Sequence, residues 1–154
     1  MLTDHEKLEI EAEAGRYPER RAASIDALKI VQRRTRWISD EDLRDVADLL
    51  GMTPADLDSV ATFYNLIHRR PVGRHVIYLC TSISCWILGC DPLREALTRR
   101  LGIRFGETTA DGRFTMVPIV CLGACDHAPT LRIDGDLHND VDPARIDGVL
   151  EKYA

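Results

Sequence analysis

The stretch His75-Val-Ile-Tyr-Leu-Cys80-Thr-Ser-Ile-Ser-Cys85 has a counterpart further along the chain, Phe114-Thr-Met-Val-Pro-Ile-Val120-Cys-Leu-Gly-Ala-Cys125. In each stretch an apolar run typical of a β-strand leads into a pair of cysteines. Two strand ends that bring paired thiols together suggest a site for a soft metal centre. The rest of the chain is interpreted as building, covering or presenting that site.

The spacing within the two cysteine pairs leaves several interpretations open. Four residues separate Cys80 from Cys85 and three separate Cys121 from Cys125, whereas structural zinc sites usually use Cys-x₂-Cys knuckles. Wider loops suit a [2Fe–2S] cluster, which takes four thiolates, and the small residues between the cysteines, such as Gly123, fit such a wrap. Spacing therefore favours the iron cluster over a structural zinc ion, and leaves a redox disulfide or unliganded thiols as further alternatives.

Other candidate groups are interpreted more simply. Cys90 is predicted to be a buried free thiol. His127 is predicted to be a solvent-facing loop histidine, with tuning of the cluster as its alternative. Pro129 is a candidate cis proline, although the trans form is favoured. No acid cluster is expected around three further histidines: His68, His75 and His138.

Length and composition are those of an ordinary globular protein. The 154 residues are 45% hydrophobic and 29% charged, so a core can form without disulfide bonds. The net charge of −5 and the lack of a basic stripe argue against a nucleic-acid partner. No apolar run approaches the roughly 18 residues of a membrane span, and the acidic N-terminus has no targeting pattern. The five cysteines, an odd number, favour a reducing cytoplasm.

The N-terminal half is predicted to be helical. Residues 1–18 are interpreted as a frayed or short helix, and residues 19–35 as a helix with one apolar stripe. Ser39 is the predicted N-cap of a third helix that ends at Gly51, and Thr53-Pro54 opens a fourth. The apolar stripe of residues 19–35 is formed by Ala22, Ile25, Leu28 and Val31.

The C-terminal half is predicted to alternate strands and helices. Strands are expected at 75–79 and 114–120, and Asp134-Gly135 is a two-residue hairpin signal between two short strands. Asp91-Pro92 and Asp142-Pro143 are each expected to open a helix. The resulting order of elements is β-α-β-β-β-α.

Five segments together resemble the small iron–sulfur subunit, known as the E subunit, of bacterial NADH:quinone oxidoreductase, the respiratory complex I. The resemblance spans residues 19–153, and related subunits of NAD-reducing hydrogenases and formate dehydrogenases share the cysteine pattern. The segments are Val60-Ala-Thr-Phe-Tyr64, Pro71-Val-Gly-Arg-His-Val-Ile77, Cys80-x₄-Cys85, Asp111-Gly-Arg-Phe114 and Cys121-Leu-Gly-Ala-Cys125.

The resemblance implies an α+β fold with two parts. An N-terminal helical bundle over residues 1–70 would precede a thioredoxin-like [2Fe–2S] ferredoxin domain with a mixed four-stranded sheet over residues 71–154. One [2Fe–2S] cluster would be bound by Cys80, Cys85, Cys121 and Cys125.

The resemblance also implies a function and partners. The chain would be a non-catalytic electron-transfer subunit whose cluster exchanges an electron with FMN on the flavin-bearing F subunit, the partner that binds NADH. The large iron–sulfur G subunit would lie nearby. The chain would sit in the peripheral arm on the cytoplasmic face of the inner membrane, without inserting into it. The equivalent hydrogenase or formate dehydrogenase subunit, and a structural zinc module for assembly, remain the alternatives.

Overall fold

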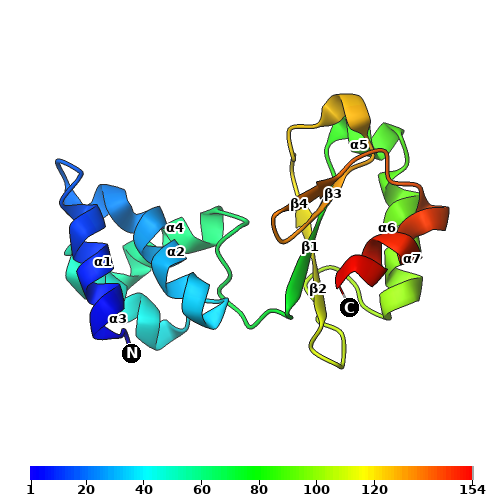
Figure 1. The fold of residues 1–154 in the computed structure, drawn as a ribbon. Coiled ribbons are helices and arrows are strands. Elements are labelled where there is room, and N and C mark those ends of the chain that lie inside the picture. The colour runs from blue at the N-terminus through cyan, green and yellow to red at the C-terminus, as the bar shows by residue number, and fades with distance from the viewer. Residues whose placement is uncertain (154) are drawn as a thin grey trace. The chain divides into compact units, whose positions relative to one another are not determined.

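The computed structural model describes residues 1–153, which divide into two compact units (Figure 1). The helical unit comprises Met1–Pro71 and the sheet unit comprises Val72–Ala154. Each unit has its own cluster of buried apolar side chains. Each unit is therefore packed around its own hydrophobic core.

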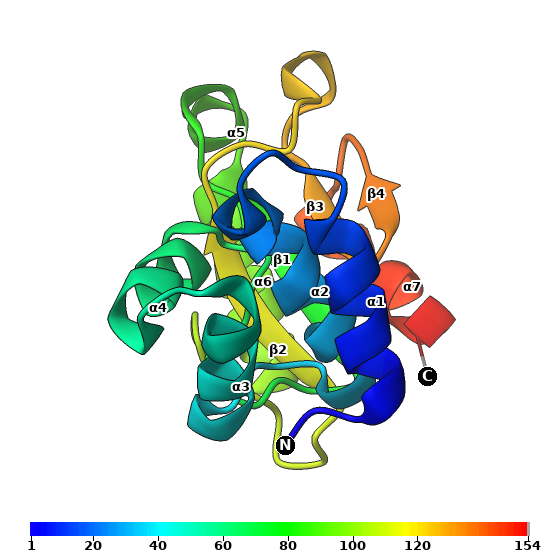
Figure 2. The ribbon, with the colours of Figure 1, turned by 90° about the vertical axis from the view of Figure 1, so that its left-hand side faces the viewer.

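The helical unit contains four α-helices and one 3₁₀ turn among its described residues. The helix α1 packs against α2, and the two lie side by side in Figure 2. The elements are α1 (Asp4–Ala14), the 3₁₀ turn η1 (Arg20–Ala23), α2 (Ser24–Thr35), α3 (Asp40–Leu50) and α4 (Pro54–Phe63).

The first helix is better ordered than its weak sequence periodicity suggests. The Thr3 side chain accepts a hydrogen bond from the backbone N–H of Glu6, and the Glu6 carboxylate accepts one from the backbone N–H of Thr3 in return. This capping box satisfies backbone donors that the first helical turn leaves unpaired. Ile10 and Ala14 are buried against the rest of the unit. Of the two alternatives, a frayed or a short helix, the structure therefore shows the short one, because caps and tertiary contacts do not depend on a strong apolar stripe.

The second helix begins later than predicted. It starts at Ser24, and residues 20–23 form the 3₁₀ turn instead. Leu28 and Val31 are buried as expected, whereas Ala22 lies in that turn and is exposed. Ala27 and Ile30 are buried as well, so the helix contacts its neighbours over a wider face than one stripe.

The third helix begins and ends where the sequence predicts, and the fourth begins there. The Ser39 side chain accepts from the N–H of Asp42, and Gly51 ends α3 with a φ of 66°. Thr53 caps α4 in the same way and Pro54 occupies its first turn. A left-handed residue at a helix end is easiest for glycine, which has no Cβ to clash.

The sheet unit is built on a mixed four-stranded sheet, as predicted. The strand order is β2-β1-β3-β4, in which β1 and β2 are parallel and the other pairs antiparallel. The strands are β1 (His75–Cys80), β2 (Phe114–Ile119), β3 (Leu131–Ile133) and β4 (Asp136–His138). The helical elements are α5 (Ile83–Ile87), α6 (Cys90–Leu101), η2 (Cys125–His127), η3 (Pro143–Arg145), α7 (Ile146–Leu150) and η4 (Glu151–Tyr153).

The core of the sheet unit forms around the central strand β1. Ile77 and Leu79 of β1 are fully buried, as are Met116 of β2 and Leu131 of β3. The helix α6 packs against β1 and contributes Leu93 to this core. A strand with neighbours on both edges and a helix on its face is held more rigidly than an edge strand. The backbone at the C-terminal end of β1, where Cys80 lies, is therefore held in place by both neighbouring strands.

Two helix predictions in the sheet unit need correction. The helix α6 begins at Cys90 with Gly89 as its N-cap, so Asp91 lies inside its first turn. The final helix is short and is flanked by 3₁₀ turns, whereas the sequence predicts one continuous helix after Asp142-Pro143. The Asp142 side chain does accept from the N–H of Ala144, so the cap itself is present.

Candidate metal centre

The topology brings the two cysteine-bearing loops to the same end of the sheet. Because β1 and β2 are parallel and Cys80 is in register with Ile119, both strands end side by side. The loop after β1 forms α5, which contains Cys85, and the loop after β2 leads to η2, which begins at Cys125. The helix α5 contacts η2, and Figure 1 shows both beyond the same end of the strands.

Cys121 and Cys125 form an exposed pair with a suitable geometry for one tetrahedral metal. Their Sγ atoms lie 3.8 Å apart. Two thiolates that each lie ~2.3 Å from one tetrahedral metal would be ~3.8 Å apart. The N–H of Gly123 points at Cys121 Sγ from 3.3 Å, and Gly123 itself adopts a φ of +81°. The loop is therefore folded around a sulfur in the way a thiolate ligand requires.

Cys80 and Cys85 form a buried pair. Each side chain is 1% exposed and belongs to the core of the sheet unit. The Sγ of Cys80 lies 3.9 Å from the carbonyl oxygen of Val120, in the loop that leads to the exposed pair. The Sγ of Cys85 lies 3.6 Å from the hydroxyl of Thr130. Sequence reasoning missed Thr130, because it lies 45 residues away and is brought to Cys85 only by the sheet.

The thiols are affected by their neighbours in different ways. The hydrogen bond and negative charge of Cys121 raise the pKa of Cys125, and a hydrogen bond from Ser84 partly offsets this. Burial raises the pKa of Cys90 to about 11, so this thiol stays protonated at neutral pH. Cys90 is buried, as predicted.

The donor set is suited to a soft metal that is shared between two thiol pairs. Thiolates are the ligands that iron–sulfur clusters and zinc prefer. Within residues 1–153 no group of three or more His, Cys, Asp or Glu side chains surrounds a single point where one metal ion would sit.

The histidines are placed differently from one another. His127 is exposed, as predicted, and its Nδ1 lies 3.1 Å from a carboxylate oxygen of Asp140. No acid cluster was expected around His75, but it does have one acidic neighbour: its Nδ1 lies 2.7 Å from Asp134 Oδ2. The hairpin brings Asp134 back beside the start of β1, and only the recognised turn hinted at this. The Ala128–Pro129 peptide bond is cis, so the trans form favoured from the sequence is not the one present.

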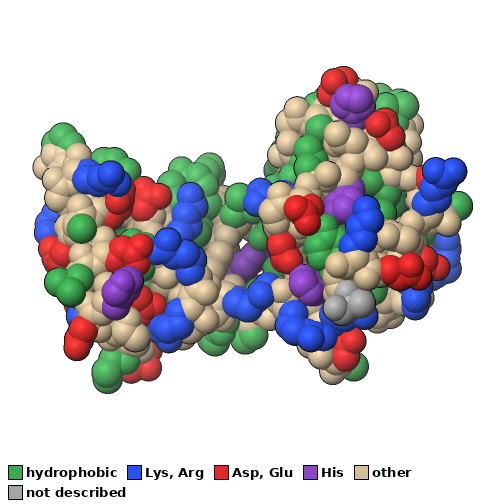
Figure 3. Space-filling model, viewed as in Figure 1, with side chains coloured by type: hydrophobic (Ala, Val, Ile, Leu, Met, Phe, Trp, Pro, Cys, Tyr) green, Lys and Arg blue, Asp and Glu red, His purple; other side chains and the backbone are tan. Residues whose placement is uncertain are grey.

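Large apolar side chains surround the cysteine loops and remain exposed. We call this set the apolar collar, and its side chains are 57–72% exposed. Figure 3 shows hydrophobic side chains together with acidic and histidine side chains at this end of the sheet unit. Sequence reasoning missed the collar, because apolar residues near a predicted helix are normally expected in a core. The collar comprises Ile83, Trp86, Ile87, Leu88 and Val120.

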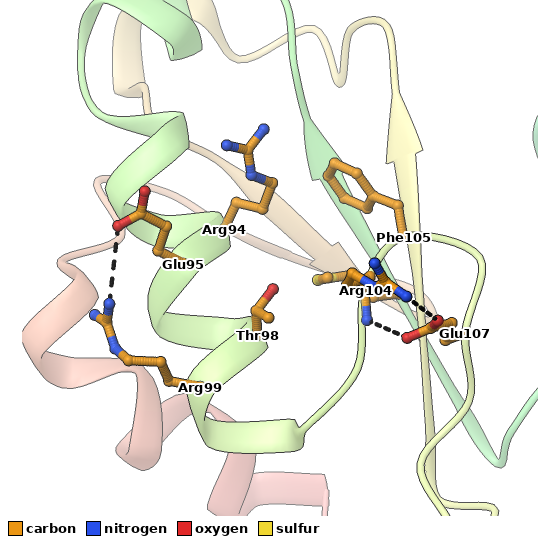
Figure 4. A pocket seen from close by; sticks show the side chains of 8 residues that line it. Arg94, Glu95, Thr98, Arg99, Arg104, Phe105 and Glu107 are labelled. Carbon is orange, nitrogen blue, oxygen red and sulfur yellow. Dashed lines mark hydrogen bonds and ion pairs between the residues drawn. The ribbon is translucent and has the colours of Figure 1, made fainter.

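A hollow of about 700 Å³ lies between α6 and the segment after it (Figure 4). Its charged side chains are paired: Arg99 lies 3.8 Å from Glu95, and Arg104 lies 3.4 Å from Glu107. Phe105 adds an apolar wall. No cysteine is among the described residues that line it, so this hollow is separate from the candidate metal centre.

No helix within residues 1–153 combines the length and the apolar character needed to cross a membrane.

Comparison with known proteins identifies the family. The family model described as thioredoxin-like [2Fe-2S] ferredoxin matches residues 10–154. The E subunit of NADH-quinone oxidoreductase from Pseudomonas aeruginosa is 46% identical over 99% of this chain and 92% of its own length. The E subunit of the same enzyme from Escherichia coli K12 is 47% identical over the same shares.

Among solved structures, an NAD⁺-reducing [NiFe]-hydrogenase in the air-oxidized state matches with a TM-score of 0.71 and 25% identity. The match covers 85% of this chain and 22% of the hydrogenase chain. The fold is therefore also found within a larger chain of a different oxidoreductase. On the family model and these relatives, this chain belongs to the thioredoxin-like [2Fe–2S] ferredoxin family, among the E subunits of NADH-quinone oxidoreductases.

Proposed function

We propose that this chain is the electron-transfer subunit of an NADH-quinone oxidoreductase and that Cys80, Cys85, Cys121 and Cys125 bind its [2Fe–2S] cluster. The observation that carries the proposal is the convergence of two thiol pairs at the ends of neighbouring parallel strands. The 3.8 Å separation of the exposed pair supports it further. A bound [2Fe–2S] cluster supplies one-electron redox chemistry.

The residues of this chain have a positioning role in the proposed function. The buried pair anchors one side of the cluster site in the core, where Cys80 and Cys85 are held by β1 and α5. The exposed pair closes the other side through a loop with Gly123 at its bend. Electron transfer needs proximity and rigidity rather than a general base, so no substrate site is assigned to this chain.

The apolar collar supports a protein partner over the exposed pair. Exposed apolar groups around a functional site are typical of protein interfaces. The partner we propose is the flavin-bearing F subunit, which binds FMN and NADH, with the large iron–sulfur G subunit nearby. We place the chain in the peripheral arm of the complex on the cytoplasmic face of the inner membrane. We propose that the helical bundle of residues 1–70 is a separate domain, which precedes the cluster-binding domain of residues 71–154 in the sequence.

Chemical analysis of the purified chain tests the proposed cofactor. Protein purified without oxygen is expected to contain two iron and two acid-labile sulfide per chain, with visible absorption and an EPR signal after reduction. A colourless protein that contains zinc in place of iron would overturn the proposal and favour a structural zinc module.

The hydrogenase match provides a second candidate, the equivalent subunit of an NAD-reducing hydrogenase. Affinity purification of the tagged chain from its own cells, followed by mass spectrometry, separates the two. Recovery of other NADH-quinone oxidoreductase subunits supports the first candidate, and recovery of a nickel–iron hydrogenase subunit supports the second.

A further inference from the structure

The hydroxyl of Thr130 lies next to one of the four proposed ligands, in a position where it can act on that ligand. Its Oγ1 is 3.6 Å from Cys85 Sγ, a distance suited to the large sulfur atom. Both side chains are 1% exposed, so water does not compete for this contact. Building on the proposed function, we propose that Thr130 donates a hydrogen bond to the Cys85 thiolate and thereby raises the reduction potential of the cluster.

The backbone holds Thr130 in place. The N–H of Cys80 donates to the carbonyl oxygen of Thr130 over 3.2 Å. The next residue, Leu131, pairs with Leu79 in the antiparallel β1–β3 ladder. Thr130 is therefore the neighbour of Cys80 across the sheet while its side chain reaches Cys85. A β-branched side chain has few rotamers, so the hydroxyl loses little further freedom by keeping this contact.

The direction of the hydrogen bond follows from the chemistry of the ligand. As free groups, the Cys85 thiol and the Thr130 hydroxyl can each be the donor. A metal-bound cysteine is a thiolate without a proton, so it can only accept. The hydroxyl must then be the donor. A buried hydroxyl without a partner is costly, and no described buried side-chain nitrogen or oxygen lacks one.

The effect on the potential has a definite sign. Reduction adds one electron, and hence one negative charge, to a site that already carries four thiolates. A donor near one of these sulfurs stabilises the more negative form more strongly. Thr130 keeps its proton and no covalent bond forms or breaks, so only the equilibrium position changes. Hydrogen bonds to sulfur are among the factors that set the potentials of such clusters.

The test compares Thr130→Val with Thr130→Ser in the full chain containing its cluster. Valine keeps the shape and removes the hydroxyl, whereas serine keeps the hydroxyl. Redox titration followed by EPR is expected to show a roughly tenfold shift of the reduction equilibrium toward the oxidised form in Thr130→Val, or about 59 mV for one electron. Thr130→Ser is expected to stay within threefold of the wild type.

Thr115→Val is the matched control. Thr115 is also buried, but its hydroxyl accepts from the N–H of Gly73 and contacts Thr108. It is expected to leave the potential unchanged. An unchanged potential in an iron-replete Thr130→Val protein, or an equal shift in Thr115→Val, would overturn the inference.

The outcomes separate this inference from the proposed function. If Thr130→Val does not bind iron, Thr130→Ala is titrated in its place, because it also lacks the hydroxyl. Failure of both variants while Thr130→Ser binds iron would show that the hydroxyl is needed for assembly, which contradicts a role limited to the potential. A wild-type chain without iron and sulfide would overturn the proposed function and this inference together.

Discussion

The two thiol pairs both lie close to strand ends, but one pair is buried and the other is exposed. Cys85 lies in α5 as its one buried residue, whereas η2, which begins at Cys125, has no buried residue. The pair Cys80 and Cys85 belongs to the core, and the pair Cys121 and Cys125 lies at the surface. One half of the site is therefore supported by packing, and the other half is held by local loop geometry.

This difference has a functional meaning under the proposed assignment. Packing keeps the buried pair in place without help from a metal, and it excludes water from that side. The exposed pair leaves the other side open beside the apolar collar, where a partner protein can approach. A site with one anchored half and one accessible half suits electron transfer across an interface.

The largest expected effect is the loss of bound iron when a cysteine of the buried pair is removed, compared with removal of one from the exposed pair. Cys85→Ala is expected to remove most of the bound iron, because no water or other ligand reaches the buried position. Cys121→Ala is expected to retain part of the iron with a changed EPR signal, since water can enter the exposed loop and supply an oxygen ligand. Iron per chain and EPR of the reduced protein measure both. Equal iron content in the two variants would contradict the distinction between the pairs.

A core substitution next to the buried pair is expected to have the next largest effect. Leu79 is fully buried beside Cys80, so Leu79→Ala should lower the free energy of unfolding by about 2–5 kcal/mol. Urea unfolding of the metal-free chain, followed by circular dichroism, measures this. Leu137→Ala is the control, because Leu137 is 44% exposed and should change the stability by about 0.5 kcal/mol or less. A loss below about 1 kcal/mol for Leu79→Ala would argue against a packed support for the buried pair.

The loop of the exposed pair depends on backbone conformation instead of packing. Gly123 has a φ of +81°, and a Cβ added there would meet no atom within 4 Å. Gly123→Ala should therefore cost about 1–2 kcal/mol through backbone strain alone. Iron release to a chelator is expected to become about 5–30 times faster. Gly135→Ala, in the hairpin, is the control, since Gly135 has equal space and no left-handed φ. Equal release rates for the two variants would count against the strained loop.

The smallest effect is expected at Cys90. Cys90→Ser should leave the EPR signal of the reduced protein nearly unchanged, because this thiol is not a proposed ligand. Burial raises the pKa of Cys90 from 9.0 to about 11 and so favours its neutral form. Above pH 9 the unfolded chain loses the proton of Cys90 before the folded chain does. The free energy of unfolding is therefore unaffected by this thiol below pH 9 and falls as the pH rises toward 11.

Alkylation of the metal-free protein at pH 8 tests whether the Cys90 thiol is buried and protonated. Cys90 should react at least tenfold more slowly than Cys121, because its thiol is both buried and protonated. Comparable labelling of both thiols would show that Cys90 is accessible.

Elements whose causes are local could be predicted from the amino-acid sequence. Caps at Ser39 and Thr53, the end of α3 at Gly51 and the hairpin at Asp134-Gly135 all follow from interactions within a few residues. The same is true of the paired cysteines after two strands. The resemblance to known subunits identified the family and the four-stranded sheet, which the comparisons and the structure confirm.

Contacts between residues far apart in the chain, and the depth at which each residue is buried, depend on the tertiary fold. It buries one cysteine pair and exposes the other, brings Thr130 to Cys85, and places Asp134 against His75. It also stabilises the first helix, whose pattern alone is weak. These outcomes depend on strand order and register, because hydrogen bonding across a sheet joins residues whose sequence separation carries no local signal.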